Sequence, residues 1–154
     1  MTITVTLNGQ KRTSEVAPDL TLYEYLRREG CFSVKCGCET SNCGLCTVHL
    51  DGKPVLSCSV LAVRADGHQV TTLESLRPQA EELGGYLADE GAEQCGFCSP
   101  GFLMNVLAME QELADPTEKE IQRYLAGNLC RCSGYQGQLR AVRRYLAARK
   151  EGRQ

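Results

Sequence analysis

The spacing of apolar residues changes character about halfway along the chain. In the first half, apolar and polar residues alternate as they do in half-buried strands, and Asn8-Gly9 and Asp51-Gly52 are hairpin turn signals. One helical stretch interrupts this pattern, with Leu22 and Leu26 one turn apart and Gly30 at its end. The expected elements are a helix over residues 20–28 and strands over residues 2–7, 11–16, 47–50 and 55–59. This order predicts a β-grasp, ferredoxin-like domain.

In the second half, apolar residues recur with a helical period instead. Ser99-Pro100 has the form of an N-cap followed by a proline in the first turn, and Thr117-x-x-Glu120 has the form of a capping box. Gly127 is placed to end the helix that this box begins. The expected helices cover residues 78–90, 100–113, 117–127 and 137–148. Short amphipathic helices bury their apolar stripes against one another, so these four predict a bundle.

The fold class that follows is α+β, with a β-grasp domain over residues 1–76 and a four-helix-bundle domain over residues 77–154. A domain of this size has a thin core, so a bound metal group should add stability to each half. The formal net charge is −2 and no basic run is present, which argues against a nucleic-acid partner.

The first residues alternate in β fashion and lack the regions of a signal peptide, and no apolar stretch approaches the length of a membrane span. We therefore expect a soluble, cytoplasmic protein without membrane insertion. Thiols stay reduced in that compartment, which matters because the chain has ten cysteines.

Eight of those cysteines form two groups with the spacing of metal ligands. In the first group, C-x4-C-x2-C followed by a more distant fourth cysteine is the plant-type spacing for a [2Fe–2S] cluster. The second group consists of a C-x2-C pair and a C-x-C pair. The expected ligands are Cys38, Cys43, Cys46 and Cys58 in the first site and Cys95, Cys98, Cys130 and Cys132 in the second. Two such clusters in one small chain indicate electron transfer.

Two other interpretations of the cysteines compete with clusters. A disulfide framework fits poorly because there is no secretory signal and such short pairs do not easily bridge. Zinc sites of four cysteines are common, but they usually show two C-x2-4-C knuckles. His49 and His68 lie outside both groups, and we expect each at the surface.

Residues near the expected ligands fit cluster binding in different ways. Gly37 and Gly44 can take the dihedral angles that a tightly wrapped loop requires. Cys98 directly precedes the expected helix start, whose positive end favours an anionic group, and Arg131 is either a charge partner or a solvated side chain. Of the remaining cysteines, Cys36 competes with Cys38 as a ligand, although the x4 spacing selects Cys38. Cys31 is expected to be a buried small hydrophobe.

Taken together, the motifs resemble the small iron–sulfur subunit of molybdenum hydroxylases, the family of xanthine dehydrogenase, aldehyde oxidoreductase and carbon monoxide dehydrogenase. The resemblance covers residues 3–147 and rests on Lys35-Cys-Gly-Cys, Cys43-Gly-Leu-Cys, Gln94-Cys-Gly-Phe-Cys-Ser-Pro-Gly and Gly127-Asn-Leu-Cys-Arg-Cys-Ser-Gly-Tyr. It implies a β-grasp [2Fe–2S] domain joined to a helical [2Fe–2S] domain. Ser41 stands where relatives generally carry glycine and Leu45 where they carry alanine, which bears on the first cluster's potential and exposure. Asn42 is expected to tolerate the left-handed geometry that the loop needs.

The resemblance also implies partner subunits and a direction of electron transfer. A large subunit would hold molybdopterin, a medium subunit would hold FAD, and the complex would dimerise. Electrons would pass from molybdenum through the helical-domain cluster and then the β-grasp cluster to FAD or another acceptor. By position, Gln94 and Cys132 match residues near the pterin of the partner subunit. The chain would then be the non-catalytic electron-transfer subunit of an oxidoreductase. The alternative is a free-standing two-cluster ferredoxin or redox sensor.

Overall fold

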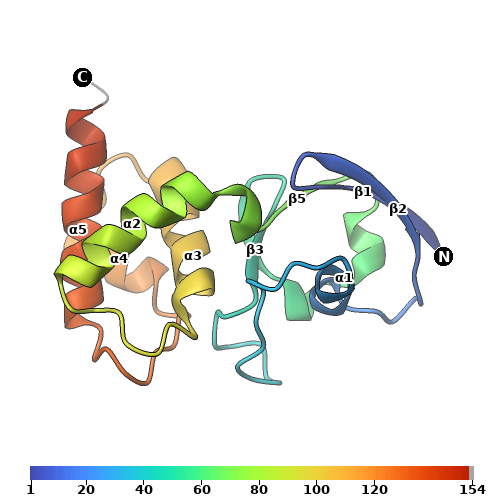
Figure 1. The fold of residues 1–154 in the computed structure, drawn as a ribbon, viewed down its shortest axis with the longest axis horizontal. Helices are drawn as coiled ribbons and strands as arrows, with labels where there is room; N and C mark the ends of the chain where they lie inside the picture. The colour runs from blue at the N-terminus through green and yellow to red at the C-terminus, as the bar shows by residue number, and fades with distance from the viewer. Residues whose placement is uncertain (153–154) are drawn as a thin grey trace.

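The computed structural model describes residues 1–152 and shows a mixed sheet beside a group of helices (Figure 1). Five strands pair in the order β2-β1-β5-β3-β4. Their bounds are β1 Thr2–Leu7, β2 Gln10–Glu15, β3 Thr47–Leu50, β4 Lys53–Leu56 and β5 Gln69–Thr71. The two hairpins are those that the sequence predicts. In the first, Asn8 and Gly9 both have positive φ, as a two-residue hairpin turn requires.

The short central strand β5 was not among the expected elements. It pairs parallel to β1, with Leu7 opposite Val70, and antiparallel to β3, with Leu50 opposite Val70. It therefore joins the two hairpins into one sheet. The predicted strand over residues 55–59 is wrong in its second half, where a 3-10 turn covers Ser57–Ser59.

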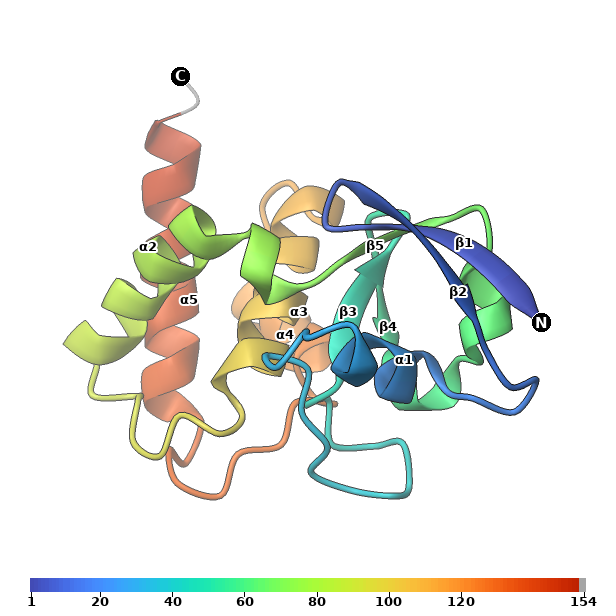
Figure 2. The same ribbon diagram turned by 45° about the vertical axis from the view of Figure 1, so that its right-hand side comes forward.

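Helix α1, Leu22–Arg28, covers one face of this sheet (Figure 2). Thr21 caps it by accepting from the Glu24 amide, while the Glu24 carboxylate accepts from the Thr21 amide. Gly30, with φ +87°, follows its end as predicted. The helix buries Leu22, Tyr25 and Leu26 against the sheet residues in a single apolar core. Cys31 belongs to this core, which confirms its expected role as a small hydrophobe.

The helical half contains α2 Arg77–Asp89, α3 Ser99–Glu112, α4 Glu118–Tyr124 and α5 Gln136–Glu151. Helix α2 packs on α3 and α5, and α4 packs on α5, around a second apolar core. The predicted capping box of Thr117 and Glu120 is present at the start of α4. That helix ends at Tyr124, so the prediction that Gly127 ends it is wrong; the chain turns over residues 125–127 before reaching the next cysteine pair. No helix within residues 1–152 is long and apolar enough to cross a membrane.

The two halves pack directly on each other, since α3 lies against β3 and β4 (Figure 1). His49 of β3 is buried at this contact, and its Nε2 donates to the Met104 carbonyl of α3 at 2.8 Å. The expectation that His49 lies at the surface is therefore wrong, because packing of the second domain covers that face of the hairpin. His68 is exposed as expected and pairs with Asp51.

The segment between β5 and α2 is fixed to the sheet by polar contacts. The side-chain Oδ1 of Asn8 accepts from the Thr72 amide at 2.8 Å. Glu74 accepts from the Ser33 amide at 2.8 Å and from the Ser33 hydroxyl at 2.6 Å. These bonds hold the start of the helical half against the β-grasp half.

Candidate iron–sulfur sites

Seven of the eight expected ligands lie in three loops; the exception is Cys58. The three loops converge at one edge of the molecule, the lower edge in Figures 1 and 2. One loop joins α1 to β3, one joins α2 to α3, and one joins α4 to α5. Cys58 lies in the 3-10 turn that follows β4. Each loop sits at the end of a packed helix or strand, so rigid elements fix its position.

In the first site, the four thiols lie in two contacting pairs. Cys38 pairs with Cys43, and Cys46 pairs with Cys58. Cys43 and Cys46 are buried, whereas Cys38 and Cys58 are partly exposed. The burial of Cys46 raises the pKa of its thiol to about 11. Cys38 has the opposite environment, because backbone N–H groups of Asn42 and Thr40 point at its sulfur and lower its pKa to about 6.

The loop closes through left-handed residues at two positions. Gly44 has φ +77° and Ser41 has φ +58°. The prediction that Asn42 takes the left-handed conformation is therefore wrong by one residue, and Ser41 bears it instead. Gly37 has no positive φ; a Cβ there would lie 2.6 Å from Cδ2 of the Leu45 side chain, which would have to shift to make room.

Cys36 does not join either thiol pair. Its side chain is exposed, and its Sγ donates to the Cys38 carbonyl at 3.0 Å. The thiol thus points along its own backbone. This geometry favours Cys38 over Cys36 as a ligand.

In the second site, the thiols again form two pairs. The sulfurs of Cys95 and Cys132 are 3.6 Å apart, and Cys98 contacts Cys130. Burial, followed by contact with Cys130, raises the pKa of Cys98 to about 12. The Ser133 amide donates to the Cys130 sulfur at 3.4 Å.

The side chains of Gln94 and Tyr135 form hydrogen bonds with backbone atoms of this second site. Gln94 Nε2 donates to the Cys132 carbonyl at 3.2 Å. The Tyr135 hydroxyl accepts from the Cys130 amide at 3.0 Å, and Tyr135 itself has φ +69°. Nothing in the sequence pattern indicated this role for Tyr135, because a non-glycine residue with positive φ has no reliable local signal.

The start of α3 differs from the expected cap. Cys98, not Ser99, occupies the N-cap position, and Ser99 lies inside the helix. The Ser99 hydroxyl donates to the Glu93 carboxylate at 2.7 Å instead of capping. An expected ligand therefore stands at the helix N-terminus, where the unpaired N–H groups and the helix dipole favour negative charge.

The two sites are neighbours across the domain contact. A cavity of about 390 Å³ is lined by Cys38 and Cys43 from one site and by all four cysteines of the other, and Arg131 also lines it. The Leu129 amide donates to the Cys43 carbonyl at 2.9 Å, which links the residue next to Cys130 to the loop of the first site.

The donor set, four thiols in two contacting pairs at each site, fits [2Fe–2S] clusters. Pairs of thiols suit a cluster in which each of two irons takes two cysteines. All ten cysteines are free thiols in this structure.

Comparisons with known proteins agree with this chemistry. Residues 5–72 match the family described as "2Fe-2S iron-sulfur cluster binding domain", and residues 72–143 match the "[2Fe-2S] binding domain" family. The xanthine dehydrogenase iron-sulfur-binding subunit of Escherichia coli O157:H7 is 46% identical over 88% of this chain and 88% of that protein. The nicotinate dehydrogenase small FeS subunit of Eubacterium barkeri is 40% identical, with the same coverage of both chains.

Solved structures show the same architecture. The crystal structure of quinoline 2-oxidoreductase from Pseudomonas putida 86 superposes with a TM-score of 0.88 at 36% identity, covering 99% of this chain and 96% of that one. Aldehyde oxidoreductase from Desulfovibrio gigas also has a TM-score of 0.88, at 34% identity, but the match covers only 18% of that longer chain. The fold, the paired thiols and these relatives together place the chain in the family of two-cluster [2Fe–2S] electron-transfer subunits of molybdenum hydroxylases.

Proposed function

We propose that this chain carries electrons between partner subunits of a molybdenum hydroxylase, with its two clusters on the eight paired cysteines. When bound, each [2Fe–2S] cluster accepts and releases one electron at a time. The pairing of the thiols carries the proposal, together with the Leu129 to Cys43 hydrogen bond that joins the sites. The ligands are Cys38, Cys43, Cys46 and Cys58 in the β-grasp site and Cys95, Cys98, Cys130 and Cys132 in the helical site.

We assign the functional units to residues 1–76 and 77–154, of which residues 153–154 lie outside the described part of the chain. A large molybdopterin-binding subunit would cover the helical site near Gln94 and Cys132. Exposed Cys132 supports this, as do two large apolar side chains that stand exposed beside the site, Phe97 at 49% and Leu129 at 47%. Such groups around a site favour burial by a partner.

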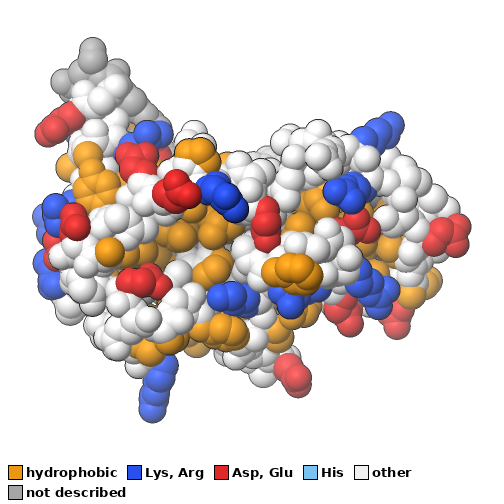
Figure 3. Space-filling view, in the orientation of Figure 1, with side chains coloured by type: hydrophobic (Ala, Val, Ile, Leu, Met, Phe, Trp, Pro, Cys, Tyr) orange, Lys and Arg blue, Asp and Glu red, His pale blue; other side chains and the backbone are white. Residues whose placement is uncertain are grey.

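On this proposal, an FAD-binding subunit receives electrons at the β-grasp site, and the whole complex dimerises. The names of the relatives support an oxidoreductase complex, because several are subunits of dehydrogenases. On the face shown in Figure 3, acidic and basic side chains are interspersed, as suits a protein partner better than nucleic acid. The cytoplasm is the proposed location because reduced thiols persist there.

Metal and sulfide analysis tests the cluster assignment. The full chain, expressed with its complex and purified without oxygen, should contain about four irons and four labile sulfides, as expected for two [2Fe–2S] clusters. Electron paramagnetic resonance of the reduced protein should resolve two different signals, because one site lies in a β-grasp loop and the other between helices. Two zinc ions without labile sulfide would contradict the assignment.

A Cys132→Ser variant tests the subunit role. In the assembled complex it should reduce electron delivery to any acceptor while the β-grasp signal persists, because its position lies in the other site. Cys36→Ser is the matched control and should leave delivery unchanged. The alternative, a free ferredoxin or redox sensor, would be a stable monomer that purifies with no partner and whose two clusters are reduced equally well by small donors.

A further inference from the structure

Gln138, in the first turn of α5, is a buried amide with an unusual environment. Its side chain is only 5% exposed, and its Oε1 is out of reach of water and has no hydrogen-bond partner. A buried amide oxygen without a partner costs about 1–3 kcal/mol, so such groups need an explanation. No motif or comparison assigns a role to this residue.

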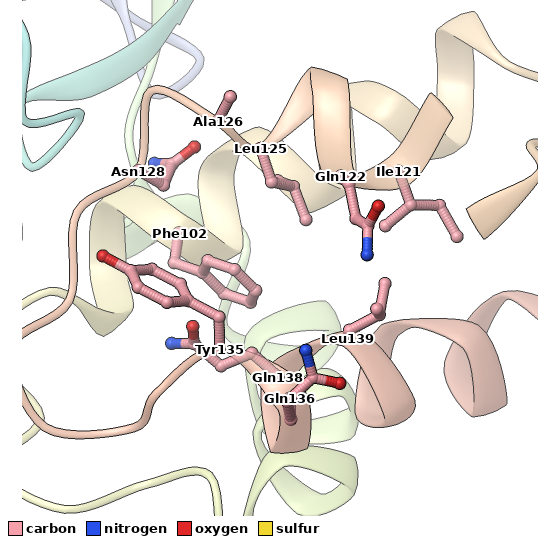
Figure 4. Close-up of a pocket in the computed structure, with 10 residues that line it drawn as sticks. All are labelled: Phe102, Ile121, Gln122, Leu125, Ala126, Asn128, Tyr135, Gln136, Gln138 and Leu139. Carbon is pink, nitrogen blue, oxygen red and sulfur yellow. The ribbon is translucent and has the colours of Figure 1, made fainter. Parts of the chain in front are cut away.

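Gln138 stands between two spaces of very different width. On one side is a cavity of about 290 Å³, which it lines with Phe102, Tyr135 and Leu139 (Figure 4). On the other is a crevice that it shares with Cys98 and Cys130 and that is too narrow for water. Because Oε1 is out of reach of water, it does not open into the wide cavity. The crevice places the Gln138 side chain beside Cys98 and Cys130 of the helical site.

The Gln138 oxygen accepts no hydrogen bond from the polar groups of that crevice. Asn128 Nδ2, the other amide nitrogen there, donates to the Gly101 carbonyl instead, at 3.4 Å. Once Cys98 and Cys130 bind iron as thiolates, their sulfurs are acceptors only. A half turn of the Gln138 amide exchanges its oxygen and nitrogen without changing its shape, and it then presents Nε2 to these sulfurs.

We propose that Gln138 donates a hydrogen bond from Nε2 to a cluster thiolate, Cys98 or Cys130, and thereby raises the reduction potential of the helical-site cluster. This inference rests on the proposed binding of a [2Fe–2S] cluster by those cysteines. Hydrogen bonds to cluster sulfurs stabilise the reduced, more negative state, and they are one of the means by which proteins set cluster potentials. Gln138 is a positioning residue in this scheme, because it touches a ligand and not the substrate.

A redox titration followed by electron paramagnetic resonance tests the proposal on the full chain with both clusters bound. Gln138→Leu removes the amide donor. At a fixed applied potential, the ratio of reduced to oxidised helical-site cluster should fall by about three- to tenfold, the effect of one net hydrogen bond. Tenfold corresponds to about 59 mV for a one-electron couple. The β-grasp signal in the same sample should titrate as in the unmodified protein.

Gln136→Leu is the matched control, because Gln136 begins the same helix and lines the wide cavity but is exposed and does not line the crevice. It should leave both potentials unchanged. Gln138→Met, which keeps the length of the side chain, should repeat the shift if Gln138→Leu folds poorly. An unchanged helical-site potential in both Gln138 variants, or an equal shift in Gln136→Leu, would overturn the proposal. A helical site that binds no iron in the unmodified protein would overturn the proposed ligand set, and this inference with it.

Discussion

Gly101→Ala should separate the two domains, because α3 touches the first cluster loop at this residue without a side chain between them. A Cβ at Gly101 would lie 2.3 Å from the Gly44 carbonyl oxygen and 2.8 Å from the Leu45 Cα. Both are backbone atoms of the loop that holds Cys43 and Cys46, so no flexible side chain can move aside. Either α3 or the cluster loop must shift.

The size of the effect follows from the contacts that such a shift disturbs. Overpacking one methyl group into a well-packed contact costs about 1–3 kcal/mol. The hydrogen bonds from His49 to Met104 and from Leu129 to Cys43 cross the same contact, and loss of either adds about 1 kcal/mol. We expect a loss of about 2–4 kcal/mol, or a fall of about 4–16 °C in the unfolding midpoint of the whole chain, since 1 kcal/mol shifts the midpoint of a protein of about 150 residues by about 2–4 °C.

Thermal unfolding of the cluster-loaded chain, followed by visible absorption of the clusters, measures this. Gly84→Ala is the control, because Gly84 lies within α2 and a Cβ there meets nothing within 4 Å. It should be neutral or raise the free energy of unfolding by up to about 1 kcal/mol, since alanine favours helix. If Gly101→Ala unfolds at the same temperature as Gly84→Ala, the close contact between the domains is refuted.

Three further predictions concern single sites. Cys38→Ser should lose iron from the β-grasp site, whereas Cys36→Ser should retain it; metal analysis showing the reverse would exchange their roles. Partial burial alone would raise the pKa of Glu74, but hydrogen bonds from Ser33 and Thr72 lower this pKa below its ordinary value of 4.5. The ionised carboxylate therefore stabilises the fold above pH 4.5, and this stabilisation is lost as the pH falls through the lowered pKa. Acid titration of unfolding should show this dependence weakened in Glu74→Gln. Tyr145→Phe removes a 2.6 Å hydrogen bond to buried Glu110 and should lower the free energy of unfolding by about 1–3 kcal/mol, measured by denaturant titration. A change near zero would contradict a stabilising role of that bond.

The sequence predicts those parts of the structure that have a local cause. Asn8-Gly9 produces the first hairpin because both residues accept positive φ, and Thr117 with Glu120 begins α4 because two backbone amides need acceptors there. The cysteine spacing has a local cause only in part: Cys38 and Cys43 meet within one loop, whereas the other thiol pairs form between segments that are distant in sequence.

Features that depend on contacts distant in sequence were missed. Strand β5 spans only Gln69–Thr71, too short for an alternating pattern, and it exists because the two hairpins leave a gap that its backbone fills. His49 looked like a surface residue because nothing near it in sequence shows that α3 packs on β3. The crevice beside Gln138 is likewise invisible until α5 is placed next to the cysteine loops.

The contact between the domains also determines how close the two redox sites lie to each other. Gly44 and Gly101 allow backbone to meet backbone, and buried Asn128 donates to the Gly101 carbonyl from the loop that carries Cys130. Contacts between the cysteine loops, and between these loops and α3, therefore help to fix the positions of the loops. A change that loosens this contact would lengthen the path between the sites without removing a single ligand. For that reason the close packing of small residues here matters to electron transfer, and the same packing that stabilises the fold keeps the two sites adjacent.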